Sequence, residues 1–232
     1  MLIDVAFEFN SEVPAGRDAD TWSPTLRAYH AHLWSKPLPG GHVFELEPAG
    51  RPGSYHLRHQ SSLGLFELSS DAFTNRLRNA PIAKSMTEDE LPANLGYTIG
   101  SAMVFPRNRV DGQQTINQRK GTHPRVRDRP DLFLECLRRH YLGLSSPLAD
   151  CLGRYGEFFA LFESFDGYVD FFLLDDLVNS DGSVDFLHEF DDFRTPAVPT
   201  TRETYLAYRR RNNEFIEARN RRIAAYASNL VA

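Results

Sequence analysis

The separation of charges along the sequence is the feature that most restricts how this chain can fold. Residues 163–192 contain ten acidic side chains and neither lysine nor arginine. Residues 107–139 contain nine basic and four acidic side chains, and residues 193–232 contain eight basic and three acidic ones, so each segment has a net charge of +5. The fold must either bring the acidic segment against the basic ones or leave a basic segment free to bind an anion.

The composition is that of a soluble globular protein. The chain has 232 residues, of which 41% are hydrophobic and 25% charged, both ordinary values. It contains no internal repeat or low-complexity linker, so we expect a single domain over residues 1–232. Two cysteines are too few for a disulfide framework or a cysteine-rich zinc site. The chain has no secretory signal and no apolar run long enough to cross a bilayer, which predicts a cytoplasmic protein without a membrane partner.

Helix start signals are the clearest local patterns. Ser23-Pro24 predicts a capped helix to Trp34, and Pro130 predicts a helix start near Asp128 or Arg129. The Thr-x-x-Glu pattern at Thr200 predicts a capping box that opens a long C-terminal helix to about residue 229. Further helices are predicted over 71–78, 146–162 and 167–179.

Alternating or apolar runs between turn residues indicate strands. They cover residues 5–9, 42–47, 55–58, 63–68, 97–105, 114–118 and 184–190. Short connections between most of them favour antiparallel pairing. The predicted fold class is therefore α+β, with a small, mostly antiparallel sheet packed by helices and a long C-terminal helix.

Several common catalytic motifs are missing. The chain has no phosphate loop, dinucleotide-binding glycine pattern, zinc-protease helix motif or nucleophile elbow. A carboxylate–x–Lys nuclease would have to use Gln118, Lys120 and the upstream Asp111, which is a degraded match. The sequence therefore identifies no cofactor and no reaction, although a site assembled from scattered residues stays open.

The best candidate site is the basic segment that leads into the helix predicted at Pro130. Unpaired backbone N–H groups at a helix N-terminus favour anions, Arg and Lys donate charge-assisted hydrogen bonds to phosphate, and histidine titrates near neutral pH. No residue of the segment is proposed as a metal ligand. The predicted ligand-binding residues are Thr115, Asn117, Arg119, Lys120, His123, Arg125, Arg127 and Arg129.

Competing interpretations stay open for each charged segment. The arginines of the candidate site could pair with the acids of 163–192 inside the molecule. Those acids could hold Mg²⁺ or Ca²⁺, although the Asp-x-Asp-x-Asp-Gly spacing is absent. The basic runs Arg209–Arg211 and Arg219–Arg222 could follow nucleic-acid phosphates. His30 lies on an apolar helical stripe, which is more typical of a hydrogen-bonded core residue than of a ligand.

One long run carries a family resemblance: TIGSAMVFPRNRVDGQQTINQRKGTHPRVRDRPDLFLECLRRHY, at 98–141. It resembles the central signature of an uncharacterised bacterial protein family, a domain of unknown function. SPTLRAYHAHLWSKPLP at 23–39, FELSSDAF at 66–73 and DGYVDFFLLDDLVN at 166–179 also resemble this family. The resemblance covers nearly the whole chain and transfers no catalytic role. Pro130 stands where relatives tend to have phenylalanine, which sharpens the helix start.

Three functional hypotheses follow. The preferred one is a cytoplasmic protein that binds a phosphate-bearing small molecule or nucleic acid through residues 115–129. The first alternative is a metal-dependent enzyme acting on a phosphorylated substrate, with His123 or Asp128 as acid–base and acids of 163–192 on the metal. The second is a non-catalytic interaction protein whose charge blocks pair with one another.

Overall fold

The computed structural model describes residues 1–73, 77 and 80–229 of the chain. Helices and a four-stranded antiparallel sheet make up an α+β fold, as the sequence predicts. The strand order follows the chain, β1-β2-β3-β4. The strands are β1 (Glu47–Ala49), β2 (His56–Ser61), β3 (Gly64–Ala72) and β4 (Ala102–Pro106).

The central strand, β3, organises the site. It pairs with β2 through a tight hairpin in which Ser61 lies opposite Gly64, and with β4 so that Asp71 lies opposite Met103. All five residues of β4 are buried, in accordance with its apolar sequence. The polar side chains at the C-terminal end of β3, those of Ser69, Ser70 and Asp71, are half-buried.

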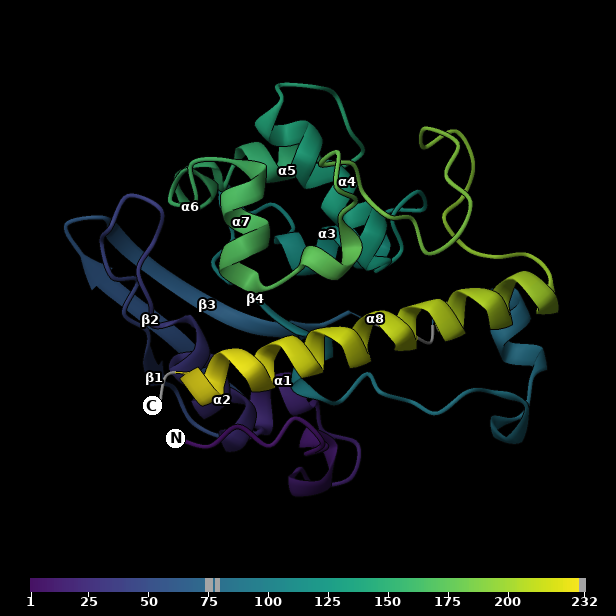
Figure 1. Ribbon diagram of the computed structural model, residues 1–232, viewed down its shortest axis with the longest axis horizontal. Helices are drawn as coiled ribbons and strands as arrows, with labels where there is room; N and C mark the ends of the chain where they lie inside the picture. The colour runs from purple at the N-terminus through teal and green to yellow at the C-terminus, as the bar shows by residue number, and fades with distance from the viewer. Residues whose placement is uncertain (74–76, 78–79, 230–232) are drawn as a thin grey trace.

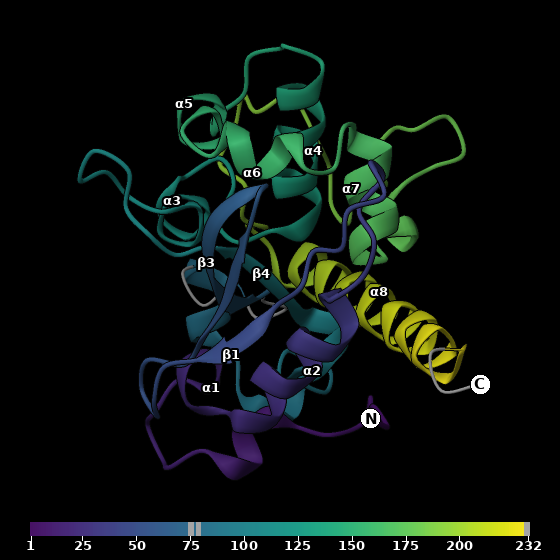
Figure 2. The same cartoon turned by 90° about the vertical axis from the view of Figure 1, so that its left-hand side faces the viewer.

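Helices cover the sheet in two groups (Figures 1 and 2). In both views α1 and α2 lie on one side, and the helices from α3 to α7 form a cluster on the other. These helices are α1 (Ala19–Trp22), α2 (Pro24–Trp34), α3 (Ile116–Thr122), α4 (Pro130–Tyr141), α5 (Ala149–Gly153), α6 (Gly156–Ala160) and α7 (Phe165–Phe172). Short 3₁₀ turns connect them: η1 (Phe9–Glu12), η2 (Pro81–Ser85), η3 (Glu88–Glu90), η4 (Ile99–Ser101) and η5 (Asp175–Leu177).

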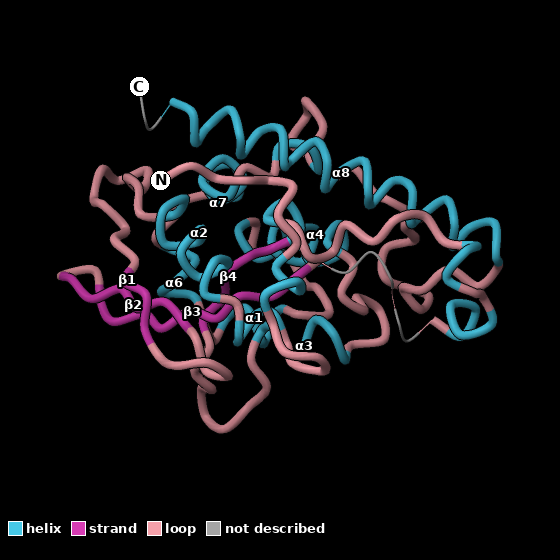
Figure 3. The backbone as a smooth tube through the Cα atoms, turned by 90° about the horizontal axis from the view of Figure 1, so that it is seen from below, coloured by secondary structure: helices cyan, strands magenta, loops and turns pink. Residues whose placement is uncertain are grey.

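The long helix α8 (Arg202–Asn229) runs along the length of the molecule. It packs against η4, η5 and η2, so it connects segments that are far apart in the sequence. Its C-terminal end lies at the same end of the molecule as the N-terminus of the chain (Figure 3). The helix is predicted correctly, but its start differs by a residue: Thr201 Oγ1, not Thr200, accepts from the backbone N–H of Thr204 at 3.2 Å.

Two predicted helices are interrupted. The segment 146–162 forms α5 and α6 with a break at Arg154-Tyr155, and Ser146 makes no side-chain cap. The segment 167–179 forms α7 and η5, because Leu173 ends α7 in a left-handed conformation with φ 54°. The predicted helix over 71–78 is wrong at Asp71 and Ala72, which belong to β3, and its remainder falls mostly outside the described residues.

Several predicted strands are absent from the described chain. Residues 5–9 lead into η1, and residues 114–118 begin α3. The segment 42–47 contributes only Glu47 to the sheet, besides an isolated bridge between Pro37 and Val43. The 184–190 segment is irregular, with one bridge from Val184 to Val178. The rings of Phe186 and Phe190 stack at 4.1 Å, whereas an extended strand would hold them about 13 Å apart on one face.

Candidate functional site

The first two residues of the predicted site, Thr115 and Asn117, cap α3 and attach it to the sheet. Thr115 forms a capping box with Gln118: the Thr115 side chain accepts from the Gln118 N–H, and the Gln118 side chain accepts from the Thr115 N–H. Asn117 Nδ2 donates to Ser69 Oγ on β3 at 3.4 Å. Thr115 and Asn117 therefore hold α3 in place against the sheet.

Lys120 points inward and ends in an internal ion-pair network. Its Nζ lies 2.6 Å from Asp71 Oδ2 and 2.7 Å from Asp128 Oδ1, and its side chain is 1% exposed. Burial works to lower the pKa of Lys120, but the carboxylates of Asp71 and Asp128 outweigh it and hold that pKa above its ordinary value. A Cβ at Gly121 would come within 2.9 Å of Asp128 Oδ2, so the glycine makes room for this carboxylate.

Replacing Lys120 by methionine tests this structural role. Asp71 and Asp128 would lose the ammonium between them, and we expect the free energy of unfolding in urea to fall by about 2 kcal/mol. This loss of stability is smaller than the loss expected when a fully buried ion pair is broken, because both carboxylates keep partial contact with water. A Lys120→Met variant as stable as the wild type would contradict an internal role for this lysine.

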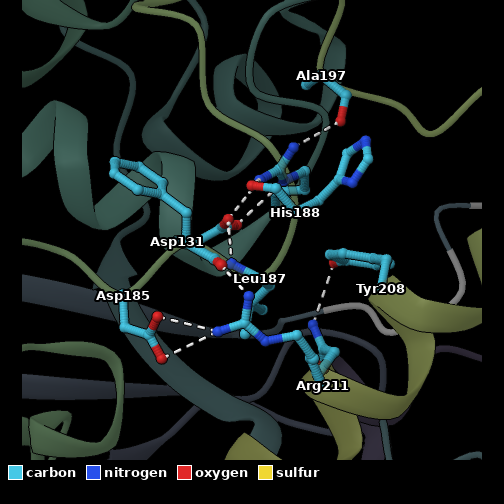
Figure 4. Close-up of polar contacts among 10 residues, drawn as sticks. Asp131, Asp185, Leu187, His188, Ala197, Tyr208 and Arg211 are labelled. Carbon is cyan, nitrogen blue, oxygen red and sulfur yellow. Dashed lines mark hydrogen bonds and ion pairs between the residues drawn. The ribbon is translucent and has the colours of Figure 1, made fainter. Parts of the chain in front are cut away.

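Arg129 is also turned inward, where it joins the segments of Asp131, His188 and Ala197, the three residues of this group that Figure 4 labels. Its Nε donates to Asp131 Oδ1 at 3.1 Å, Nη1 to the carbonyl of Ala197 at 3.0 Å, and Nη2 to the carbonyl of His188 at 3.2 Å. Asp131 Oδ2 accepts in addition from the Leu187 N–H at 2.9 Å. The positive end of α4 is therefore occupied by the chain's own aspartate, and Arg129 is not placed to bind a ligand at that helix N-terminus.

The other four predicted residues form a basic surface. Arg125 is exposed, and Arg119, His123 and Arg127 are half-buried. Within the described residues, no carboxylate forms an ion pair with any of these three arginines. His123 Nδ1 accepts from the Arg125 N–H at 3.2 Å, which leaves the proton of the neutral ring on Nε2. Burial, followed by the guanidinium groups of Arg119, Arg125 and Arg127, lowers the pKa of His123.

Arg154 extends this surface and was not predicted. Its Nη2 donates to the carbonyl of Gln114 at 3.1 Å, and both Arg154 and Arg119 act on the pKa of the Cys151 thiol, so the two guanidinium groups lie near each other. Burial is the dominant influence and raises that pKa. Arg154 lies in a sequence stretch with little net charge, at the C-terminal end of α5. We call Arg119, His123, Arg125, Arg127 and Arg154 the basic surface.

Arginines of α4 and α8 form ion pairs with part of the acidic segment 163–192. Arg139 of α4 contacts Asp192, whereas from α8 Arg211 contacts Asp185 at 2.9 Å and Arg222 contacts Asp176 at 3.0 Å. Arg222 also lies 3.5 Å from Asp175, which lines an open groove of about 340 Å³ beside α7 together with Asp166 and Asp170. Across the described ranges, no group of three His, Cys, Asp or Glu side chains is arranged to hold a metal ion.

The arginine runs of α8 do not form one continuous face. Arg209 and Arg219 are buried, Arg211 and Arg222 are ion-paired, and Arg210 and Arg221 are exposed. Neighbouring arginines on a helix point in different directions, about 100° apart. The nucleic-acid interpretation of these runs stays a prediction, but only their exposed members are available for it.

A chain of polar contacts connects α2, β3 and α1. The indole N–H of Trp34 donates to His30 Nδ1 at 2.9 Å, so the neutral imidazole carries its proton on Nε2, which contacts Ser70 Oγ at 3.0 Å. Burial and the charge of Arg219 lower the pKa of His30 to about 3. Because Nε2 is already protonated, His30 is not a base for Ser70, and the pair lacks the arrangement of a hydrolase nucleophile. The prediction that His30 is a hydrogen-bonded core residue is confirmed.

Asp20 ends this chain of contacts and was missed in the sequence. The Ser70 hydroxyl hydrogen bonds to the Asp20 carboxyl, and Asp71, Asp18 and Lys120 lie close enough to influence it. Burial, followed by repulsion from Asp71 and Asp18, raises the pKa of Asp20 to about 8. Asp20 lies 51 positions before Asp71, so no local pattern shows that the two carboxyls meet across α1 and β3.

Comparisons with known proteins give a family and no activity. None of the helices in the described part of the chain is long and apolar enough to span a membrane. No curated protein and no solved structure was found to be significantly similar to the chain. A family model described as a family of unknown function, DUF6994, matches residues 3–223. This match spans nearly the whole chain, from the segment before η1 into the last turns of α8, and the protein therefore belongs to the DUF6994 family.

Proposed function

We propose that the protein binds a phosphate-bearing ligand, a nucleotide or a nucleic acid, at the basic surface. The observation that carries this proposal is the uncompensated charge around His123. After burial, three guanidinium groups lower the pKa of His123, and none of them is ion-paired to a carboxylate of the described residues. The positive potential of these groups attracts anions. The attraction is strongest for phosphates, because they accept several charge-assisted hydrogen bonds at once.

The chemistry of the surface also favours an oxyanion. Arg119, Arg125 and Arg127 supply planar donors that suit phosphate oxygens. The Nε2–H of His123 adds a neutral donor, since its Nδ1 is held by the Arg125 N–H. A ligand of this class accords with the cytoplasm, the location that the sequence predicts.

The alternative of a metal-dependent enzyme receives less support. Asp128, one of its two proposed acid–base residues besides His123, is held by Lys120 at 2.7 Å, and some acids of 163–192 are paired with arginines. The alternative of internally paired charge blocks explains Arg139, Arg211 and Arg222, whose partners lie in 163–192, but not the basic surface.

A double variant tests the proposal. We expect Arg119→Ala/Arg125→Ala to bind ATP and a single-stranded oligonucleotide at least about tenfold more weakly by calorimetry, because each arginine contributes a charge-assisted contact. The melting temperature should change little, because neither side chain is ion-paired in the described structure. The matched control is Arg17→Ala/Arg51→Ala, which removes the same charge from exposed positions outside both the basic surface and α8.

Two outcomes would overturn the proposal. One is equal weakening in both double variants, which would indicate a general charge effect; the other is a wild-type protein that binds neither probe. A separate readout is the NMR titration of His123. Bound phosphate should raise its pKa, since an anion offsets the three guanidinium charges that lower it.

A further inference from the structure

Three arginines of the described part of the chain are almost completely buried, and one of them differs from the others. Arg129 is balanced by Asp131, and Arg219 donates to the carbonyls of Phe172, Gly100 and Ala102. Arg209 is 1% exposed, and its Nη2 donates to the carbonyl of Pro92 at 2.6 Å and, more weakly, to that of Ala93 at 3.5 Å. Its Nε and Nη1 are buried and have no hydrogen-bond partner in the described structure.

The surroundings of Arg209 do not supply the missing charge. No carboxylate of the described residues forms an ion pair with Arg209. Its neighbours on α8 are the exposed Arg210 and Arg211, whose guanidinium group is directed to Asp185. Asn212 lies three positions further along the same helix, and its buried Oδ1 also has no hydrogen-bond partner in the described structure. A buried charge with free donors is costly, so native proteins almost always satisfy it with a partner, a water or an ion.

We propose that Arg209 is the centre of a buried binding site for a small oxyanion, either a carboxylate or a phosphate, whose oxygens accept from Nε and Nη1. An anion fits better than water alone, because it supplies both the acceptors and the negative charge that Arg209 lacks. The near-complete burial of the side chain restricts the ligand to a small one. The site lies on α8 beside residues 92–93 and is separate from the basic surface on α3, so it stands independently of the function proposed above.

Anion-dependent thermal stability tests this site. Acetate and inorganic phosphate are titrated against the wild type and against Arg209→Met, which keeps much of the volume of the side chain without its charge. We expect the melting temperature of the wild type to rise by about 4 °C at an anion concentration ten times Kd, and that of Arg209→Met to stay constant. General salt effects on stability act on both proteins and cancel in the comparison.

The Arg119→Ala/Arg125→Ala variant separates the two proposals. It should keep the full anion response, because its Arg209 site is intact. A response that disappears in this double variant and persists in Arg209→Met would assign the anion to the basic surface and overturn the Arg209 site. Equal responses in all three proteins, or none in the wild type, would overturn it as well and leave water as the partner of Arg209.

A spectroscopic measurement keeps the test independent of how well Arg209→Met folds. In the wild type, the Nε–H resonance of Arg209 should shift on addition of acetate or phosphate, whereas that of Arg219, whose Nε already donates to Phe172, should not. A stationary Arg209 resonance at saturating anion would contradict the proposal.

Discussion

Replacement of Arg219 by methionine is expected to lower the free energy of unfolding by about 4 kcal/mol, the largest effect of any single substitution considered for this protein. Arg219 has no exposed surface and lies on the buried face of α8. Its Nε and Nη2 donate to the carbonyl of Phe172 at 3.2 and 3.0 Å, and its Nη1 donates to the carbonyls of Gly100 and Ala102, both at 2.9 Å. One guanidinium group therefore joins α7, η4 and β4 to α8.

The reason for the large effect is the set of acceptors that would be left behind. Phe172 ends α7, where backbone carbonyls lack helical partners and a cation is favoured. Methionine fills much of the volume but donates no hydrogen bond, so the three buried carbonyls would lose this donor. Burial lowers the pKa of Arg219 to about 9, so the group still carries its charge at pH 7. The ring of Trp34, 5.8 Å from the guanidinium carbon, adds a cation–π contact.

Urea denaturation of Arg219→Met and of Arg221→Met measures the effect. Arg221 is exposed two positions further along α8, so its loss should change stability by no more than about 0.5 kcal/mol. A loss below about 1 kcal/mol in Arg219→Met would show that the carbonyls find other donors, and the role assigned to Arg219 would be wrong. The free energy of unfolding of Arg219→Lys should lie between those of Arg219→Met and the wild type. One ammonium group cannot donate to carbonyls of three segments at once, as the planar guanidinium group does.

Local signals explain which elements could be predicted from the sequence. The Ser23 hydroxyl accepts from the Leu26 N–H, and Pro130 occupies the first turn of α4, so both helix starts depend on residues within four positions. The β2–β3 hairpin is equally local. By contrast, the alternation at 5–9 and 184–190 predicted strands that do not form, because alternation fits any segment with one buried side, whereas a strand also needs a partner.

The site was less predictable than the fold, because burial decides which charges are available. In the sequence Lys120, Arg125 and Arg129 look alike. Lys120 is buried only because Asp71, 49 positions earlier, meets it across β3 and α3, and Arg129 is buried because residues 187–197 return to cover it. For the segment 163–192 the sequence left pairing with the candidate-site arginines, metal binding and solvated acids open; in the structure its ion-pair partners come from α4 and α8.

Substitution of Asp20 by asparagine is expected to make the protein more stable at pH 8 by about 2 kcal/mol and to leave its stability at pH 4 nearly unchanged. The asparagine amide would resemble the protonated carboxyl: its side-chain oxygen can still accept from Ser70, and it carries no charge to repel Asp71 and Asp18. The substitution therefore removes the ionisation of this position while it retains the hydrogen bond to β3.

The sign of the effect follows from the pKa of Asp20, which burial and the neighbouring carboxylates raise from 3.8 to about 8 in the folded protein. Between pH 4 and pH 8 the folded state holds a proton that the unfolded state has released. The stabilisation is therefore complete below about pH 4 and is lost as the pH rises toward 8. Water reaches the half-buried carboxyl, so we expect about 2 kcal/mol rather than the larger value that the full shift would give.

The measurement is the free energy of unfolding of both proteins in urea from pH 4 to pH 8.5. His30 acts in the opposite direction: its pKa is lowered from 6.5 to about 3, so its contribution is complete above pH 6.5 and is lost as the pH falls. It acts in wild type and variant alike, so the difference between the two curves isolates Asp20. If the difference in the free energy of unfolding stays constant over this pH range, Asp20 is ionised throughout. In that case the contact between α1 and β3 does not depend on a proton on the Asp20 carboxyl.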